Sequence, residues 1–143
     1  MYVDENIEQR TCRPLNTGSY ESSAWCWILE KGGKKILVGS IYRSTSSTTE
    51  NDLLLLKKIN QAYEIAGDNR LLILGDFNVP GIDWVDKGIK SDADDFDKEM
   101  LETVNDCFLY QHVKEDTRFM NDQSSSLDLA FTKEENDVKN LKT

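Results

Sequence analysis

The sequence contains only three cysteines and a single histidine among its 143 residues. Cys12, Cys26 and Cys107 are widely spaced, so they form neither a CxxC pair nor the Cys/His spacing of a zinc site. We therefore expect free thiols in a reducing compartment, with Cys26 and Cys107 in the core. We interpret the histidine, His112, as a residue at the end of a strand rather than as a catalytic group.

Long apolar runs are also absent from the sequence. No stretch approaches the roughly 20 apolar residues that a membrane-spanning helix needs. The first five residues, MYVDE, are partly acidic and lack the apolar core of a signal peptide. We expect a soluble intracellular protein, and the sequence leaves open whether it is nuclear or cytoplasmic.

Basic residues are in the minority, with 17 Lys and Arg against 26 Asp and Glu and a net charge of −9. Sequence-independent binding to nucleic acid depends on Lys and Arg that neutralise phosphates, so this balance disfavours tight binding by the chain alone. A nuclease remains compatible with this charge balance, because a bound divalent cation and a local basic patch can offset the global charge.

The length suits one domain, spanning residues 1–143, with a core of its own.

The first half of the chain predicts a hairpin followed by a helix and a further strand. Residues 24–29 and 35–43 are strand segments joined by a turn at 31–34, which predicts antiparallel pairing. Thr48 and Thr49 before Glu50 are typical of a helix start. Apolar residues then recur at steps of three and four, namely Leu53, Leu56, Ile59, Tyr63 and Ala66. The strand–helix–strand order favours parallel pairing of the two strands that flank the helix.

The second half predicts one more helix and two strands. Phe96, Met100, Val104 and Phe108 repeat every four residues and indicate an amphipathic helix, with Asp94 or Asp95 near its cap. The acidic segment 92–97 lacks the central glycine and terminal glutamate of a calcium-binding loop, so we interpret it as a charge cluster at the helix start. Residues 109–113 predict a short strand, and residues 127–131 predict the last clear one.

The stretch LLILGDFN, residues 71–78, carries the strongest functional signal. Its uncharged apolar run predicts a buried strand, which ends at Gly75 and is followed by Asp76 and Asn78. In open α/β sheets, ligands bind outside the carboxyl ends of the strands. A spacing of two on an extended backbone places Asp76 and Asn78 on one side and Phe77 on the other. An Asx turn is the alternative interpretation, since Asp and Asn favour such turns in any case.

Four segments now occur in a characteristic order: IYRS at 41–44, GDFN at 75–78, Thr117-Arg118, and SLD at 126–128. Together they resemble the endonuclease/exonuclease/phosphatase superfamily, and more narrowly the apurinic-type endonuclease domain of non-LTR retrotransposons. The resemblance is clearest over residues 36–131, and the segment LYQHV at 109–113 also resembles the retrotransposon branch.

The resemblance implies an α/β (α+β) fold, a four-layer sandwich of two facing mixed sheets with helices outside. It also implies Mg²⁺-dependent cleavage of a phosphodiester in DNA, in a parent protein that carries a reverse transcriptase. Asp76 would orient or deprotonate the attacking water and is the candidate metal ligand, while Asn78 would bind the water or a phosphate oxygen. Tyr42 would place its hydroxyl on the scissile phosphate, and Asp128 would orient a histidine. Substrate contacts would come from Arg43, Thr117 and Arg118.

The chain departs from the family pattern at both ends. The family has an early asparagine and an early glutamate, its principal metal ligand, and neither is found ahead of the matching segments. It also ends in Ser-Asp-His, whereas no histidine follows Asp128. We therefore expect a truncated domain whose activity is impaired or absent in this chain alone. The alternatives are a phosphatase or phosphodiesterase of the same superfamily, and a non-catalytic decayed domain or binding module.

Overall fold

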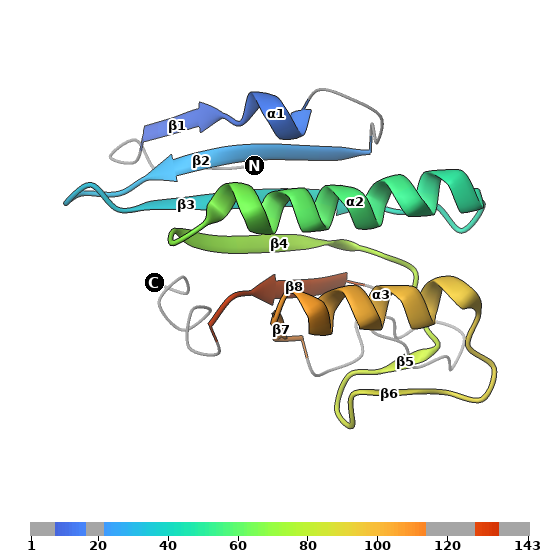
Figure 1. Cartoon of the computed structure of the whole chain (residues 1–143). Coiled ribbons are helices and arrows are strands. Elements are labelled where there is room, and N and C mark those ends of the chain that lie inside the picture. The colour runs from blue at the N-terminus through green and yellow to red at the C-terminus, as the bar shows by residue number, and fades with distance from the viewer. Residues whose placement is uncertain (1–7, 17–21, 114–127, 135–143) are drawn as a thin grey trace.

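The computed structural model describes residues 8–16, 22–113 and 128–134 (Figure 1). The strands are β1 (Glu8–Thr11), β2 (Ser23–Leu29), β3 (Lys35–Tyr42), β4 (Arg70–Asp76), β5 (Ile82–Asp83), β6 (Gly88–Ile89), β7 (Tyr110–Gln111) and β8 (Asp128–Thr132). The helices are α1 (Arg13–Asn16), α2 (Thr49–Ala66) and α3 (Asp95–Asp106).

Six of the strands form one mixed sheet in the order β1-β2-β3-β4-β8-β7, and β5 and β6 form a small sheet of their own. The predicted hairpin is confirmed, since β2 and β3 pair antiparallel. The predicted parallel pairing is also confirmed: β3 and β4, which precede and follow α2 in the sequence, are neighbouring parallel strands. Every other neighbouring pair in the large sheet is antiparallel.

The helices α2 and α3 pack on the same face of the large sheet (Figure 1). Leu37, Leu71 and Ile73 of the central strands are fully buried beneath the helices, together with Ile59 of α2 and Met100 of α3. Alternate residues of the same strands point to the other face, where Cys26, Ile36 and Val38 form a separate cluster with Ile28 and Leu72. All three cysteines are buried as free thiols, as predicted for Cys26 and Cys107.

The α+β class with a mixed sheet is confirmed. The described residues supply one large sheet with helices on one face, together with the two-stranded β5–β6 sheet. The second large sheet that the resemblance implies is therefore not formed by this part of the chain.

Both predicted helices are present, but each buries a slightly different face from the one predicted. Thr48 caps α2 by accepting from the backbone of Asn51, and the start of α3 is closed by a reciprocal pair, Asp94 and Asp97. Leu53, predicted on the apolar face, is 53% exposed, and Leu55 is buried instead. Phe108, the last of the four-residue repeats, is 75% exposed beyond the end of α3. In the α3 repeat each step of four advances about 40° beyond a full turn, so repeated steps rotate off the buried face and leave Phe108 outside it.

Within the part of the chain that the structure describes, none of the helices combines the length and apolarity that crossing a membrane requires.

Candidate active site at the carboxyl end of β4

The central feature of the site is a lateral row of three side chains across neighbouring strands. Tyr42 at the end of β3 is the register partner of Asp76 at the end of β4, and Asp76 is the partner of Asp128 at the start of β8. Register partners on adjacent strands project to the same face of a sheet. The structure thus brings three of the four predicted catalytic residues together, and Asn78 follows two residues after Asp76.

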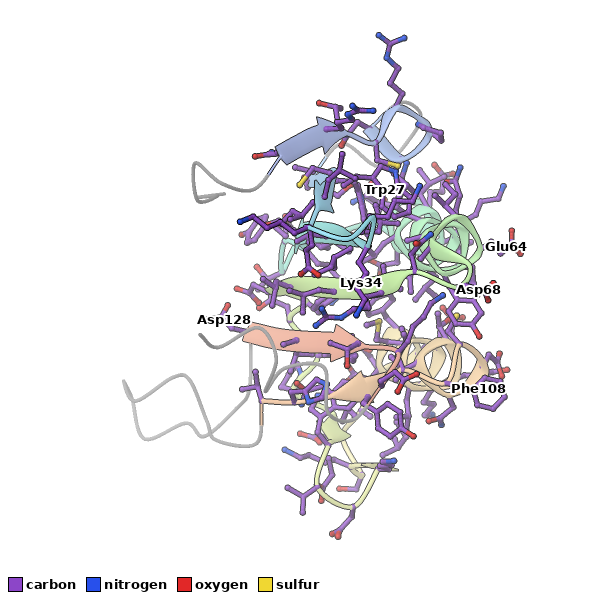
Figure 2. All side chains as sticks on the ribbon, turned by 90° about the vertical axis from the view of Figure 1, so that its left-hand side faces the viewer. Trp27, Lys34, Glu64, Asp68, Phe108 and Asp128 are labelled. Atoms are coloured by element: carbon purple, nitrogen blue, oxygen red, sulfur yellow. The ribbon has the colours of Figure 1, made fainter. Side chains whose placement is uncertain are left out.

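The row lies on the face of the sheet that the helices leave uncovered. Phe77, between Asp76 and Asn78, is fully buried and its ring packs edge-on against Phe131 at 5.5 Å. Tyr42 is 55% exposed, and Asp128 projects from the side of the sheet away from the helices (Figure 2). Although Asp128 is followed by the apolar residues of β8, it is not buried among them: it is the exposed first residue of that strand.

Gly75 permits the close approach of β3 and β4 at this end of the sheet. A Cβ atom on Gly75 would lie 2.0 Å from the carbonyl oxygen of Ile41, far inside van der Waals contact. The backbone of Arg43 continues the parallel pairing past the end of β3 by donating to the carbonyl of Asp76 at 2.8 Å. A residue without a side chain before Asp76 therefore keeps the row of Tyr42 and Asp76 in register.

Asn78 sits in the Asx turn that the alternative interpretation of the sequence predicted, and not on an extended backbone. Its backbone N–H donates to Oδ1 of Asp76 at 3.2 Å, which is an Asx turn, and its φ of 50° lies in the left-handed region that Asn tolerates. Its side-chain amide donates to the carbonyl oxygen of Arg43. The Asx turn is therefore part of the site geometry, because it ties Asn78 to Asp76 and to the end of β3.

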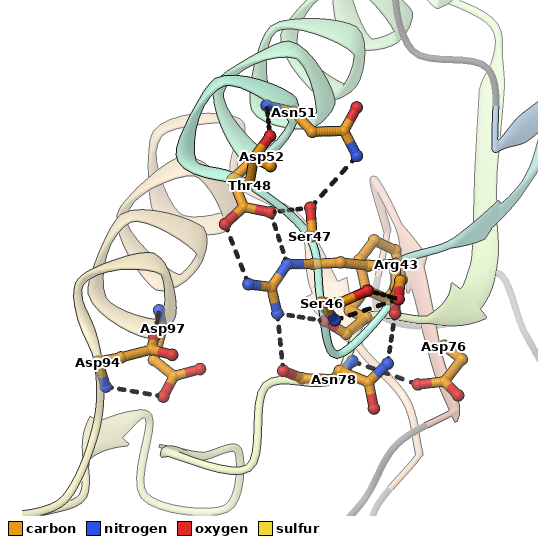
Figure 3. A network of polar contacts seen from close by, with 12 residues as sticks. Arg43, Ser46, Ser47, Thr48, Asn51, Asp52, Asp76, Asn78, Asp94 and Asp97 are labelled. Atoms are coloured by element: carbon orange, nitrogen blue, oxygen red, sulfur yellow. Dashed lines mark hydrogen bonds and ion pairs between the residues drawn. The ribbon is translucent and has the colours of Figure 1, made fainter.

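Arg43 is buried at the centre of a polar network (Figure 3). Its Nε and Nη2 donate to the two carboxylate oxygens of Asp52 at 2.8 and 3.0 Å. Its Nη1 donates to the carbonyl oxygens of Phe77 and Asn78 at 3.2 and 2.9 Å, and the guanidinium lies 3.8 Å from the centre of the Phe96 ring. These contacts favour a positioning role for Arg43 over the direct substrate contact that the resemblance implies.

Asp52 and Ser47 are members of this network that the sequence did not single out. Burial raises the pKa of Asp52, but the hydrogen bonds from Arg43 and Ser47 outweigh it and the pKa falls below its ordinary value of 3.8. The hydroxyl of Ser47 donates to Asp52 at 2.7 Å. An aspartate in the first turn of a helix is common for electrostatic reasons alone, so its position gave no specific signal.

The other residues discussed in the sequence do not join this row. Thr117 and Arg118 fall outside the described residues. Nε2 of His112 is 2.6 Å from the hydroxyl of Thr132, at the opposite end of β8 from Asp128. This location agrees with the interpretation of His112 as a strand-end residue.

Metal binding at this site would depend on few protein ligands. Over residues 8–16, 22–113 and 128–134, no group of three or more His, Cys, Asp or Glu side chains gathers as a metal cluster. Asp76 and Asp128 still place two carboxylates side by side. One or two carboxylates, completed by waters and substrate phosphate oxygens, are the usual set for Mg²⁺. The row therefore fits an ion that a phosphate substrate helps to bind.

Comparison with known families decides the ancestry of this site. Residues 36–143 match the family model described as endonuclease-reverse transcriptase. The chain belongs to the endonuclease/exonuclease/phosphatase superfamily. The match covers β3, β4 and β8, which carry the row, and it begins at the residue where the resemblance first became clear. No curated protein matches this chain significantly.

Three solved structures are similar to this chain to different degrees. The endonuclease domain of TRAS1, a telomere-specific non-LTR retrotransposon, superposes with a TM-score of 0.66 at 18% identity, covering 90% of this chain and 54% of that one. A superfamily protein from Bacteroides vulgatus has a TM-score of 0.49 at 16% identity, covering 90% and 53%. The mannosyl-6-phosphatase Bt3783 of Bacteroides thetaiotaomicron has a TM-score of 0.49 at 15% identity, covering 77% and 42%. The chain thus spans about half the length of the TRAS1 domain.

Proposed function

We propose that the row of Tyr42, Asp76 and Asp128, with Asn78, is the site of a DNA endonuclease that hydrolyses a phosphodiester with the help of Mg²⁺. The observation that carries this proposal is the register, which aligns a phenol and two carboxylates at one end of three neighbouring strands. The family match and the likeness to the TRAS1 endonuclease domain support DNA as the substrate class. The family description also supports a parent protein that joins this domain to a reverse transcriptase.

In this proposal Asp76 accepts the proton of the attacking water. The water oxygen forms a bond to phosphorus while the bond from phosphorus to the sugar oxygen breaks, and the leaving oxygen takes a proton from solvent. Tyr42 donates its hydroxyl to a phosphate oxygen, where charge increases in the transition state. The side-chain amide of Asn78 donates one hydrogen bond to the Arg43 carbonyl oxygen. Its second N–H is then available to donate to the water or to a phosphate oxygen.

Asp76 and Asp128 are the residues that would hold Mg²⁺ together with the substrate. When bound, the ion neutralises charge on the phosphate oxygens. No histidine side chain belongs to this row among the described residues, so protonation of the leaving oxygen lacks an imidazole donor. We therefore propose slow hydrolysis by this chain alone, in keeping with the impaired activity expected from the sequence.

The test is cleavage of an end-labelled duplex oligonucleotide in the presence of Mg²⁺. A nuclease shortens the labelled strand, whereas a phosphatase releases terminal phosphate and leaves the strand length unchanged. We expect slow shortening by the wild type and its loss in Asp76→Asn, with the exposed Asp68→Asn as the control that retains it. Release of terminal phosphate without shortening would favour the phosphatase alternative, and no reaction at all would favour the non-catalytic one.

A further inference from the structure

Four separate segments of the chain meet at the guanidinium of Arg43. The residue itself follows β3, Asp52 belongs to the first turn of α2, and Phe96 lies in the first turn of α3. The loop after β4 contributes the carbonyl oxygens of Phe77 and Asn78. The contact of Arg43 with each segment is direct, so its side chain links both helices to the end of the strand that carries Asp76.

We propose that Arg43 and Asp52 form a positioning pair that holds Asn78 in its working conformation. Two interactions run in opposite directions between Arg43 and Asn78: Nη1 donates to the Asn78 carbonyl at 2.9 Å, and the Asn78 amide donates to the Arg43 carbonyl. Asn tolerates a left-handed φ such as that of Asn78, but a local constraint is still needed to make it the one conformation that the residue adopts. The paired contacts with Arg43 provide that constraint.

The chemistry of the network requires a guanidinium at this position. Four hydrogen bonds leave Arg43 in two directions, two toward Asp52 and two toward the backbone after β4. A planar fork with five donors can satisfy both at once, whereas an ammonium group is a point charge that cannot span them. A third hydrogen bond to the Asp52 carboxylate, donated by the Ser47 hydroxyl at 2.7 Å, fixes the orientation of this acceptor.

This inference rests on the proposed function for its catalytic meaning, but it can be tested without activity. The test is amide hydrogen exchange of the folded protein, read at Asn78 and at Leu71 and Ile73 within β4. In Arg43→Lys we expect exchange at Asn78 to become at least about tenfold faster while Leu71 and Ile73 keep their protection. Arg70→Lys is the matched control, because Arg70 begins the same strand and pairs with Glu30 at 3.6 Å near the surface.

A second variant and a second measurement make the result decisive. If Arg43→Lys also loses protection at Leu71 and Ile73, the substitution has disrupted the sheet itself. Ser47→Ala is then the variant to test, and we expect it to show a smaller acceleration of exchange at Asn78.

In cleavage of the duplex oligonucleotide we expect Arg43→Lys to lower kcat by about tenfold or more with KM little changed, as for a misplaced catalytic group. Unchanged exchange at Asn78 in an intact sheet, or an unchanged kcat in a wild type that cleaves, would overturn the positioning pair. A wild type that does not cleave would overturn the proposed function alone, since the exchange result stands independently.

Discussion

Asp76 and Asp128 lie directly opposite one another, the first at the end of β4 and the second at the start of β8. Like charges in this relationship destabilise an antiparallel pair of strands. A cation that binds both carboxylates would offset this repulsion. This relationship connects the stability of the fold to the ion that the proposed reaction uses.

Mg²⁺ is therefore expected to stabilise the folded chain through these two side chains. At a free concentration of ten times the dissociation constant, the unfolding free energy of the wild type should rise by about 1.4 kcal/mol relative to EDTA. Asp76→Asn and Asp128→Asn should each show a smaller rise. Denaturant unfolding with and without Mg²⁺ measures the difference, and equal rises in all three proteins would place the ion elsewhere.

Asp52→Asn should destabilise the protein in a pH-dependent manner. Removing one member of a buried ion pair leaves Arg43 uncompensated, at a cost of about 3 kcal/mol near neutral pH. The pKa of Asp52 lies below its ordinary 3.8 in the folded state because its hydrogen bonds outweigh the effect of burial. The stabilising contribution of Asp52 is therefore fully present above 3.8, the ordinary pKa that applies to the unfolded chain. It is lost as the pH falls through the lower pKa of the folded state.

The control for this prediction is Glu30→Gln, which removes the surface pair with Arg70 and should cost less than about 1 kcal/mol. Equilibrium unfolding of the wild type and both variants at several pH values gives the comparison. A cost for Asp52→Asn that is equal to that of Glu30→Gln, or that does not shrink in acid, would contradict the ion pair as described.

Asp97→Asn should show the opposite dependence on pH. Burial raises the pKa of Asp97, and the hydrogen bond from the backbone of Asp94 offsets only part of that effect. Its Oδ1 is buried and without a hydrogen-bond partner among the described residues. Because the folded state holds this proton to a higher pH than the unfolded state, stability is lost as the pH rises through the interval between the two pKa values.

The unfolding free energy of Asp97→Asn relative to the wild type should accordingly increase as the pH rises from below 3.8, the ordinary pKa of an aspartate. Asp106→Asn, an exposed change on the same helix, is the control. Parallel pH profiles for Asp97→Asn and the wild type would show that Asp97 titrates normally.

Gly75→Ala should disrupt the sheet at the site. The added Cβ would meet the Ile41 carbonyl at 2.0 Å, and neither strand can withdraw without losing the parallel register. We expect a loss of about 3 kcal/mol of unfolding free energy, typical of overpacking in a tight core. Gly88→Ala is the control, since nothing lies within 4 Å of its added Cβ. Equal stabilities of the two variants by thermal unfolding would contradict the close approach.

Local pattern was sufficient to predict the elements that carry the site. The two strands at 35–43 and 71–75, the helix between them and their parallel pairing follow from periodicity and from the handedness of short connections. Tyr42 could be placed near Asp76 and Asn78 because it ends the strand that pairs in parallel with the strand leading to them. The burial of Phe77 on the opposite side followed from a spacing of two, whereas the Asx turn followed from the turn preference of Asp and Asn, which was the alternative interpretation.

The polar network could not be predicted in the same way. Asp52 and Arg43 are nine residues apart and meet only because α2 folds back over β3, and the Phe77 carbonyl joins them across 34 residues. The exposure of Asp128 could not be predicted either. Leu129 and Phe131 of the same strand are buried, but Asp128 is exposed because it is the first residue of β8. A sequence window does not show where a strand begins.

Nicking of a supercoiled plasmid tests the central claim most directly, namely that this sheet edge hydrolyses phosphodiesters in DNA through Asp76. The initial rate is compared for the wild type, Asp76→Ala and the exposed Asp106→Ala, each with Mg²⁺ and with EDTA. The account predicts slow, Mg²⁺-dependent nicking by the wild type and Asp106→Ala, and a loss of about 100-fold or more in Asp76→Ala. Nicking that survives in Asp76→Ala, or a wild type no faster than the EDTA control, would contradict it.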